Sequence, residues 1–156
     1  MSQMQNEFKI RWFAAIKTLF ICVLFTALFL YRGATANQNK ITLSENLHLT
    51  EIDKDAFVVT HSFPWASNSL LVRASKSDYF LINTLCDNHG AKLLTDWIKN
   101  NFGDVNLVAI NTGFHVDNLG GNEYLLSKGI AVYGSNLTAK LVAERGQREK
   151  NLLLSW

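Results

Sequence analysis

The sequence predicts an α/β fold in which helices cover a mixed sheet. Between residues 47 and 85, apolar and β-branched residues come in short runs of the kind found in strands. From residue 87 onward, stretches with helical spacing alternate with short apolar strands. Two hairpins followed by the order β-α-β-α-β-α predict one α/β sandwich layer.

The first half of this region predicts two β-hairpins. The stretch LHLTEIDKDAFVVTHSF alternates on both sides of Asp53-Lys54-Asp55, which predicts strand, turn and strand. SLLVRAS and DYFLINTL are joined by a short polar stretch around Lys76-Ser77 and predict the second hairpin. The stretch PWASNS between the hairpins is expected to be a loop.

The second half predicts helices between buried strands. In DNHGAKLLTDWIKNNFG, apolar residues fall at helical spacing up to a stop at Gly103, and Trp97 on this stripe is expected in the core. VNLVAIN and IAVYG predict strands, and NEYLLSKG between them predicts a short helix that ends at Gly129. NLTAKLVAER predicts a last helix with Ser135 or Asn136 as its N-cap.

Residues 1–36 are expected to be a separate unit. Basic residues precede an uncharged apolar core of 14 residues, Thr18 to Tyr31, and Ala34-Thr35-Ala36 is an A-x-A cleavage pattern. This order predicts a secretory signal peptide, hence a periplasmic protein, with a mature domain over 37–156. The alternative is an uncleaved anchor in the inner membrane, which Arg32 beside the apolar core leaves open. The membrane is a partner only in that case.

Charge and cysteine content narrow the possible partners. Residues 1–36 hold four of the 15 Lys and Arg and one of the 13 Asp and Glu, which leaves 11 basic and 12 acidic residues. No basic face is predicted, so nucleic acid is not expected as a partner. Cys86 is the single cysteine of the mature part, either a small buried hydrophobe or a free thiol near a site.

The stretch INTGFHVDNLGG, Ile110 to Gly121, is the strongest candidate for a site. It follows a predicted strand and presents His115 and Asp117 two positions apart. Imidazole and carboxylate are ordinary zinc ligands, and catalytic zinc usually takes three protein ligands and a water. The Gly120-Gly121 pair is expected to let the backbone turn tightly into the next helix.

The order of these motifs resembles the metallo-β-lactamase superfamily, and within it the periplasmic zinc β-lactamases. The resemblance rests on AINTGFHVDNLGGNEYLLSKGIAVYGSNLTAKL and on YFLINTLCDNHGAKLLTDWIKNNFG, and extends from about Leu47 to Trp156. It implies the αββα sandwich fold, of which this chain would supply the N-terminal half, a mixed sheet with helices on one face.

The family loop reads Thr-His-x-His-x-Asp-His-x-Gly-Gly, and this sequence keeps part of it. His115 and Asp117 match zinc ligands, and the resemblance gives Asp117 the further role of orienting the attacking hydroxide. Gly113 and Asn118 stand where the family has His. Asn83 replaces an Asp that supports the metal loop in the family.

Several alternatives remain open for this loop and its neighbours. His115 and Asp117 could bind zinc weakly or with a partner's ligands, or Asp117 or Asn118 could cap the following helix while His115 bonds locally. Phe63 and Trp65 in the apolar loop after the first hairpin match a loop that folds over the β-lactam in the family, or else Trp65 packs on the sheet edge. His48, His61 and His89 are expected at the surface or in loops.

The expected activity is zinc-dependent hydrolysis of the β-lactam ring, with a chain that is truncated, poor in ligands, and weakly active or inactive alone. A β-lactam-type small molecule is the expected substrate. One alternative is a non-catalytic periplasmic domain that binds a partner, or a half-enzyme that needs a separately encoded C-terminal half. Another is a gene fragment with no stable fold, which a cooperative melting transition would exclude.

Overall fold

The computed structural model describes residues 39–154, with side chains described through residue 151, and all of them lie in one unit, Gln38–Trp156. The predicted signal peptide over 1–36 lies outside the described residues. Seven strands and four helices follow one another along the chain: β1 Lys40–Ser44, β2 Leu47–Asp53, β3 Ala56–His61, β4 Ser67–Arg73, β5 Asp78–Ile82, α2 Asn88–Phe102, β6 Asn106–Asn111, α3 Val116–Leu119, α4 Asn122–Ser127, β7 Ala131–Gly134 and α5 Asn136–Leu154. Within this part of the chain, no helix is long and apolar enough to cross a membrane.

The strands form one mixed sheet in which each strand pairs with its neighbour in sequence, in the order β1-β2-β3-β4-β5-β6-β7. The first five strands are antiparallel, and β5, β6 and β7 are parallel. The predicted hairpins and β-α-β units are therefore confirmed. Strand β1 was not predicted, and it pairs with β2 along one edge of the sheet.

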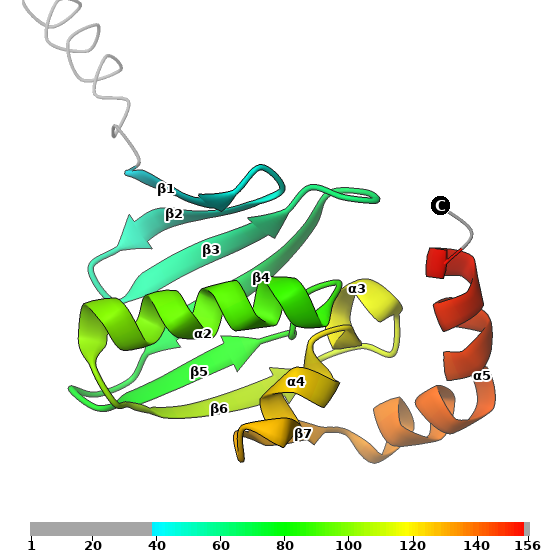
Figure 1. Ribbon diagram of the computed structural model, residues 1–156. Helices are drawn as coiled ribbons and strands as arrows, with labels where there is room; N and C mark the ends of the chain where they lie inside the picture. Colours follow the sequence, from blue (N-terminus) through cyan, green and yellow to red (C-terminus); the bar gives the residue numbers. More distant parts are fainter. Residues whose placement is uncertain (1–38, 155–156) are drawn as a thin grey trace, which may run out of the picture. The chain divides into compact units, whose positions relative to one another are not determined.

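One face of the sheet carries the core. Right-handed crossovers that run from β5 to β6 to β7 place their helices on the same face, and Figure 1 shows α2 and α4 lying there. The core joins side chains of this face to α2, and its members exposed by less than 2% are Leu47, Leu49, Val59, Leu71, Tyr79, Leu81, Leu85, Ala91, Leu94, Ala109 and Leu125. Trp97 packs against this core, with its ring centroid 5.4 Å from those of Phe57 and Phe102, as predicted.

The helix ends follow from side-chain caps and glycine. Helix α2 begins after Asp87, whose carboxylate accepts a hydrogen bond from the Gly90 backbone N–H, and it ends before Gly103 at φ +80°. Ser135 precedes α5 and accepts a hydrogen bond from the Thr138 backbone N–H. The short helix predicted over NEYLLSKG is confirmed as α4, and a further short helix that was not predicted, α3, precedes it across Gly120 and Gly121.

Candidate functional site

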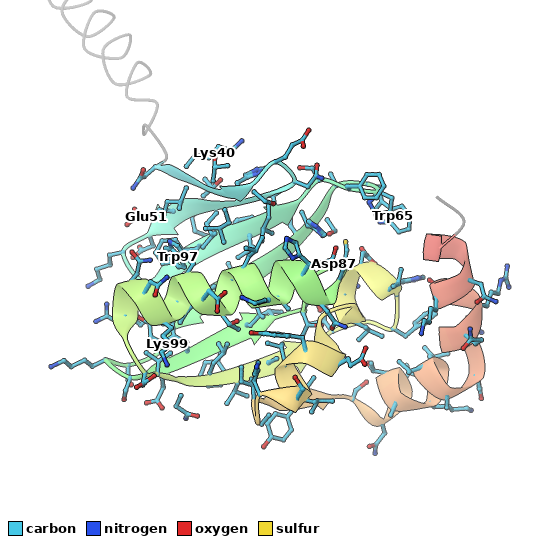
Figure 2. All side chains as sticks on the ribbon, viewed as in Figure 1. Lys40, Glu51, Trp65, Asp87, Trp97 and Lys99 are labelled. Carbon is cyan, nitrogen blue, oxygen red and sulfur yellow. The ribbon has the colours of Figure 1, made fainter. Side chains whose placement is uncertain are left out.

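The candidate site lies at the carboxyl ends of strands β3, β5 and β6, where the chain leaves the sheet. Because β3 is antiparallel to β4 and β4 is antiparallel to β5, strands β3, β5 and β6 run in the same direction. The loops that follow them therefore leave the sheet at the same edge. These loops hold the predicted site residues Phe63, Trp65 and His115, and Asp117 follows in the first turn of α3. Figure 2 shows Trp65 and Asp87 at this end of the strands.

His115 stands just before α3 and is held by α5 rather than by its own loop. Its Nδ1 lies 3.0 Å from Oε2 of Glu149, and its side chain is 57% exposed whereas that of Glu149 is 20% exposed. The His115 ring lies 4.2 Å from the ring of Phe114, and the Arg145 guanidinium lies 5.6 Å from the Phe114 ring. Local hydrogen bonding of His115 was therefore the wrong expectation, since its partner is 34 residues away.

Asp117 lies in the first turn of α3 and is partly buried. The expectation that Asp117 or Asn118 caps the following helix is wrong, because both lie inside α3 and the N-cap of α4 is Gly121, without a side-chain cap bond. A carboxylate in a first turn still suits the positive end of a helix dipole. Asp117 is close enough to Cys86 that its charge helps to raise the pKa of the Cys86 thiol.

Gly113 and Asn118 are neighbours in space. A Cβ placed on Gly113 would lie 3.1 Å from Nδ2 of Asn118, so the Asn118 amide sits beside the position where the resembled family has a His side chain. The Asn118 backbone carbonyl accepts a hydrogen bond from the Thr84 N–H at 2.8 Å. Asn118 thus ties the loop after β6 to the loop after β5.

Asn83 supports the start of the loop, in the role that the resemblance implies. Its side-chain Oδ1 accepts hydrogen bonds from the Thr112 backbone N–H at 3.0 Å and from the Thr112 hydroxyl at 2.9 Å. Asn83 has φ +64°, a left-handed conformation that Asn tolerates better than most residues. The amide oxygen therefore supplies the acceptor that an Asp carboxylate would supply here.

Gly120 and Gly121 are required for close packing and not for an unusual turn. Both have right-handed helical backbones, with φ −60° and −85°. A Cβ on Gly120 would lie 1.8 Å from the Cys86 carbonyl oxygen, and one on Gly121 would lie 2.1 Å from that of Thr84. The tight-turn explanation was wrong: the pair lets two backbone segments touch at the edge of the sheet.

A buried polar network that the sequence did not reveal joins Thr84, Asn111 and Asn122. The fully buried Thr84 donates its hydroxyl to Oδ1 of Asn122 at 2.7 Å, and Asn111 donates Nδ2 to the same oxygen at 2.9 Å. Oδ1 of Asn111 is buried without a hydrogen-bond partner. Polar residues directly after buried strands were the available signal, because strand ends at this edge meet one another.

A second cluster joins His61, Ser67, Cys86 and Asp87. His61 is 6% exposed, so the expected surface position was wrong, and its Nε2 lies 3.8 Å from Oδ2 of Asp87. Its position in β3 gave the signal, because His61 alternates in register with buried Phe57 and Val59. Burial lowers the pKa of His61 more than the Asp87 carboxylate raises it.

Cys86 is buried at 2% exposure, and its Sγ lies 3.1 Å from the Ser67 hydroxyl. Burial is the main cause that raises the pKa of the thiol, and the nearby Asp117 and Asp87 carboxylates add to it. A thiol with a raised pKa is a poor nucleophile. Of the two expectations for Cys86, the small buried hydrophobe describes it, although it also borders the cavity beside α3.

That cavity, of about 640 Å³, lies between the loop and α5. Phe114, Val116, Leu119 and Val142 give it apolar walls, and Asp87, Glu123, Glu149 and Lys150 bring charge to its lining. Phe63, which is 57% exposed, and the half-buried Trp65 do not line it. The predicted substrate contacts of these two residues remain predictions.

The described residues do not fit a zinc ion as the resembled enzymes hold it. No group of three or more His, Cys, Asp or Glu side chains is arranged to hold a metal anywhere in residues 39–151. His115 and Asp117 are two donors, Gly113 offers none, and a ring nitrogen of His115 already pairs with Glu149. Two donors fall short of the three protein ligands of a catalytic zinc site.

Comparisons with solved structures relate this chain to metallo-β-lactamases. The structure is similar to a metallo-beta-lactamase from Pontibacter korlensis, with a TM-score of 0.60 and 31% identity over 64% of this chain and 48% of that one. It is also similar to TMB-1, a structure solved to study substrate and inhibitor binding, with a TM-score of 0.59 and 28% identity over 66% of this chain and 49% of that one. The chain thus spans about half the length of each. No protein-family model and no curated protein sequence matches.

Proposed function

We propose that this is a metallo-β-lactamase-like protein that is weakly active or inactive by itself. The described residues have the metallo-β-lactamase fold, and they match about half of the length of the metallo-β-lactamases compared above. The family activity would be zinc-dependent hydrolysis of the β-lactam ring. The observation that carries the proposal is the donor set of the loop, which is reduced to His115 and Asp117.

Two contacts support the interpretation that the loop keeps the backbone position of a metal loop but has fewer metal-binding side chains. Asn83 still holds Thr112 through two hydrogen bonds, and Gly120 still packs against the Cys86 carbonyl. The loop is therefore well positioned, while the space next to Gly113 contains the Asn118 amide. A positioned loop with two donors favours weak, labile zinc binding.

Hydrolysis of a chromogenic β-lactam by the purified chain with added Zn²⁺ tests this proposal. We expect EDTA-sensitive turnover to be absent or far slower than that of the Pontibacter korlensis protein measured in parallel. Gly113→His should tighten zinc binding, measured by competition with a chromophoric chelator, because it adds an imidazole donor. Gly113→Ala is the matched control and should leave binding unchanged. EDTA-sensitive turnover by the unaltered chain at a rate near that of the Pontibacter korlensis protein would overturn the proposal.

A second candidate function is partner binding, either as a non-catalytic domain or as a half-enzyme completed by a separately encoded C-terminal half. One face of the sheet favours it, since among the described residues both crossover helices lie on the other face. Mixing the chain with the C-terminal half of the Pontibacter korlensis protein tests the half-enzyme form. EDTA-sensitive turnover by the mixture, and by neither component alone, is the expected result for a half-enzyme.

We also propose export to the periplasm through cleavage after Ala36. The A-x-A pattern and the basic residues before the apolar core support it. N-terminal sequencing of the protein from a periplasmic extract should begin at Asn37. An intact Met1 in a membrane fraction would instead support the inner-membrane anchor.

A further inference from the structure

Two side chains of α5 contact the neighbouring rings of Phe114 and His115. Arg145 and Glu149 are four positions apart, and helix residues at this spacing lie on one face. The Arg145 guanidinium lies 5.6 Å from the Phe114 ring, and Oε2 of Glu149 lies 3.0 Å from Nδ1 of His115. The two rings are 4.2 Å apart and inclined at 31°. The His115 ring is therefore held on one face by Phe114 and at one nitrogen by Glu149.

The contact at Nδ1 determines which ring nitrogen of His115 carries the proton. A neutral imidazole has one N–H donor and one nitrogen with a free lone pair. An ionised carboxylate only accepts hydrogen bonds, so the 3.0 Å contact with Glu149 requires the hydrogen on Nδ1. The lone pair of neutral His115 is then on Nε2, at the side of the ring away from Glu149. Hydrogen bonds to a charged acceptor are stronger than neutral ones, which favours this tautomer.

Glu149 is the acid of α5 that faces the loop. Its side chain is 20% exposed and lines the cavity beside α3, so water screens its charge less than at an open surface. The second acid of this helix, Glu144, is 51% exposed and lies 3.9 Å from Lys140 on the same helix. Glu144 therefore serves as a matched residue for experiments on Glu149.

We propose that Glu149 is a positioning residue, which accepts the Nδ1–H of His115 and so fixes the tautomer that leaves the Nε2 lone pair free. A lone pair held in this way can accept a proton or bind a transition-metal cation. Carboxylates orient metal-binding imidazoles through the second ring nitrogen in the same manner. Only the mention of a metal rests on the proposed function, because the tautomer is a property of the chain alone. Helix α5, which lies beside α3 (Figure 1), thereby becomes part of the site.

Nitrogen NMR of the full chain, labelled with ¹⁵N at histidine, measures this tautomer without any metal. An ordinary imidazole is neutral at about pH 9, and its protonated and unprotonated nitrogens then resonate far apart. The signals of His115 are those missing from His115→Gln. We expect the form with hydrogen on Nδ1 to exceed the form with hydrogen on Nε2 by at least about threefold.

Glu149→Gln separates the charge of this side chain from its shape. An amide offers either its oxygen or its NH₂ group, so it can pair with both tautomers of His115. The excess of the Nδ1–H form should therefore fall at least about threefold. Glu144→Gln is the same substitution on the same helix and should leave the tautomer ratio unchanged. A role of Glu149 in packing alone would leave the ratio unchanged in both variants.

Two results would overturn the inference. One is a predominance of the Nε2–H form in the unaltered chain, which requires no substitution to detect. The other is an Nδ1–H excess that persists in Glu149→Gln, because some other group would then fix the proton of His115.

Added Zn²⁺ distinguishes this inference from the proposed function. Zn²⁺ bound at the free lone pair should shift the Nε2 resonance of His115 more than the Nδ1 resonance. A Glu149-dependent Nδ1–H excess with no zinc shift at either nitrogen would support the positioning role and contradict weak zinc binding by the loop. Zinc binding by a chain with the Nε2–H tautomer would overturn the positioning role and leave the proposed function intact.

Discussion

Gly120→Ala should strongly destabilise the domain, although its backbone conformation suits alanine. The added Cβ would lie 1.8 Å from the Cys86 carbonyl oxygen and 2.7 Å from the Asp87 backbone nitrogen. Contacts below 3.0 Å essentially do not occur, so the two segments must separate by at least about 1.2 Å at that oxygen. That oxygen belongs to backbone and cannot rotate away as a side chain can.

The magnitude follows from what this separation breaks. Two hydrogen bonds join the segments, from the Gly120 N–H to the Leu85 carbonyl at 2.9 Å and from the Thr84 N–H to the Asn118 carbonyl at 2.8 Å. Each contributes about 1 kcal/mol net, and overpacking adds about 1–3 kcal/mol, so the free energy of unfolding should fall by about 3–5 kcal/mol. The melting temperature should fall by at least about 10 °C.

Thermal melting followed by circular dichroism measures this change. Gly113→Ala is the control, because its Cβ would meet only the flexible Asn118 side chain at 3.1 Å, and its melting temperature should stay within about 2 °C of the unaltered chain. Peptide-level thiol labelling should also find Cys86, now 2% exposed, reacting faster in Gly120→Ala. The steric reasoning is refuted if Gly120→Ala melts together with the control.

Three further predictions concern the support of the loop by Asn83, the dependence of stability on pH, and the contact between His115 and α5. Asn83→Ala removes both hydrogen bonds from Thr112 at a residue with positive φ, so the free energy of unfolding in urea titrations should fall by about 2–3 kcal/mol. Asn83→Asp keeps the acceptor and should change this free energy by less than about 1 kcal/mol. Burial lowers the pKa of His61 in the folded chain from its usual 6.5, so the unfolded chain binds the proton more readily. The stability that neutral His61 contributes is therefore present above pH 6.5 and is lost as the pH falls through the folded pKa. His61→Leu should make the melting temperature depend less on pH between about 7.5 and 5, and an unchanged slope would contradict the assignment. Glu149→Gln removes the partner of His115 and should speed trypsin cleavage of α5 at Arg145 and Lys150. The melting temperature should stay nearly constant, because an ion pair at the surface contributes less than about 1 kcal/mol. Equal cleavage rates would show that His115 does not hold α5.

Sequence periodicity was sufficient for most of the sheet and for α2. The hairpin turn at Asp53–Asp55 and the stop at Gly103 depend on local chemistry, which neighbouring residues encode. Strand β1 was missed because it is a five-residue edge strand defined by its pairing with β2. Helix α3 was missed because its four residues, Val116–Leu119, make little more than one turn, which is too short to show a helical period in the sequence.

The candidate site was predictable only in part for the same reason. His115, Asp117 and Asn83 stand in one loop or beside it, and a motif can identify them. The partner of His115 comes from Glu149 on α5, 34 residues later, and no period or motif encodes that contact. The burial of His61 was available from alternation along β3, because it shares the face of Phe57 and Val59.

The strand order has a consequence for how this domain forms. Each strand of the sheet pairs with the strand before it in the chain, from β1 through β7. No pair has to wait for a strand that is made later, and the turns that join the antiparallel neighbours from β1 to β5 are short, which favours rapid folding. On the ribosome, the sheet can therefore grow by one strand at a time, with each new strand added to an edge already in place.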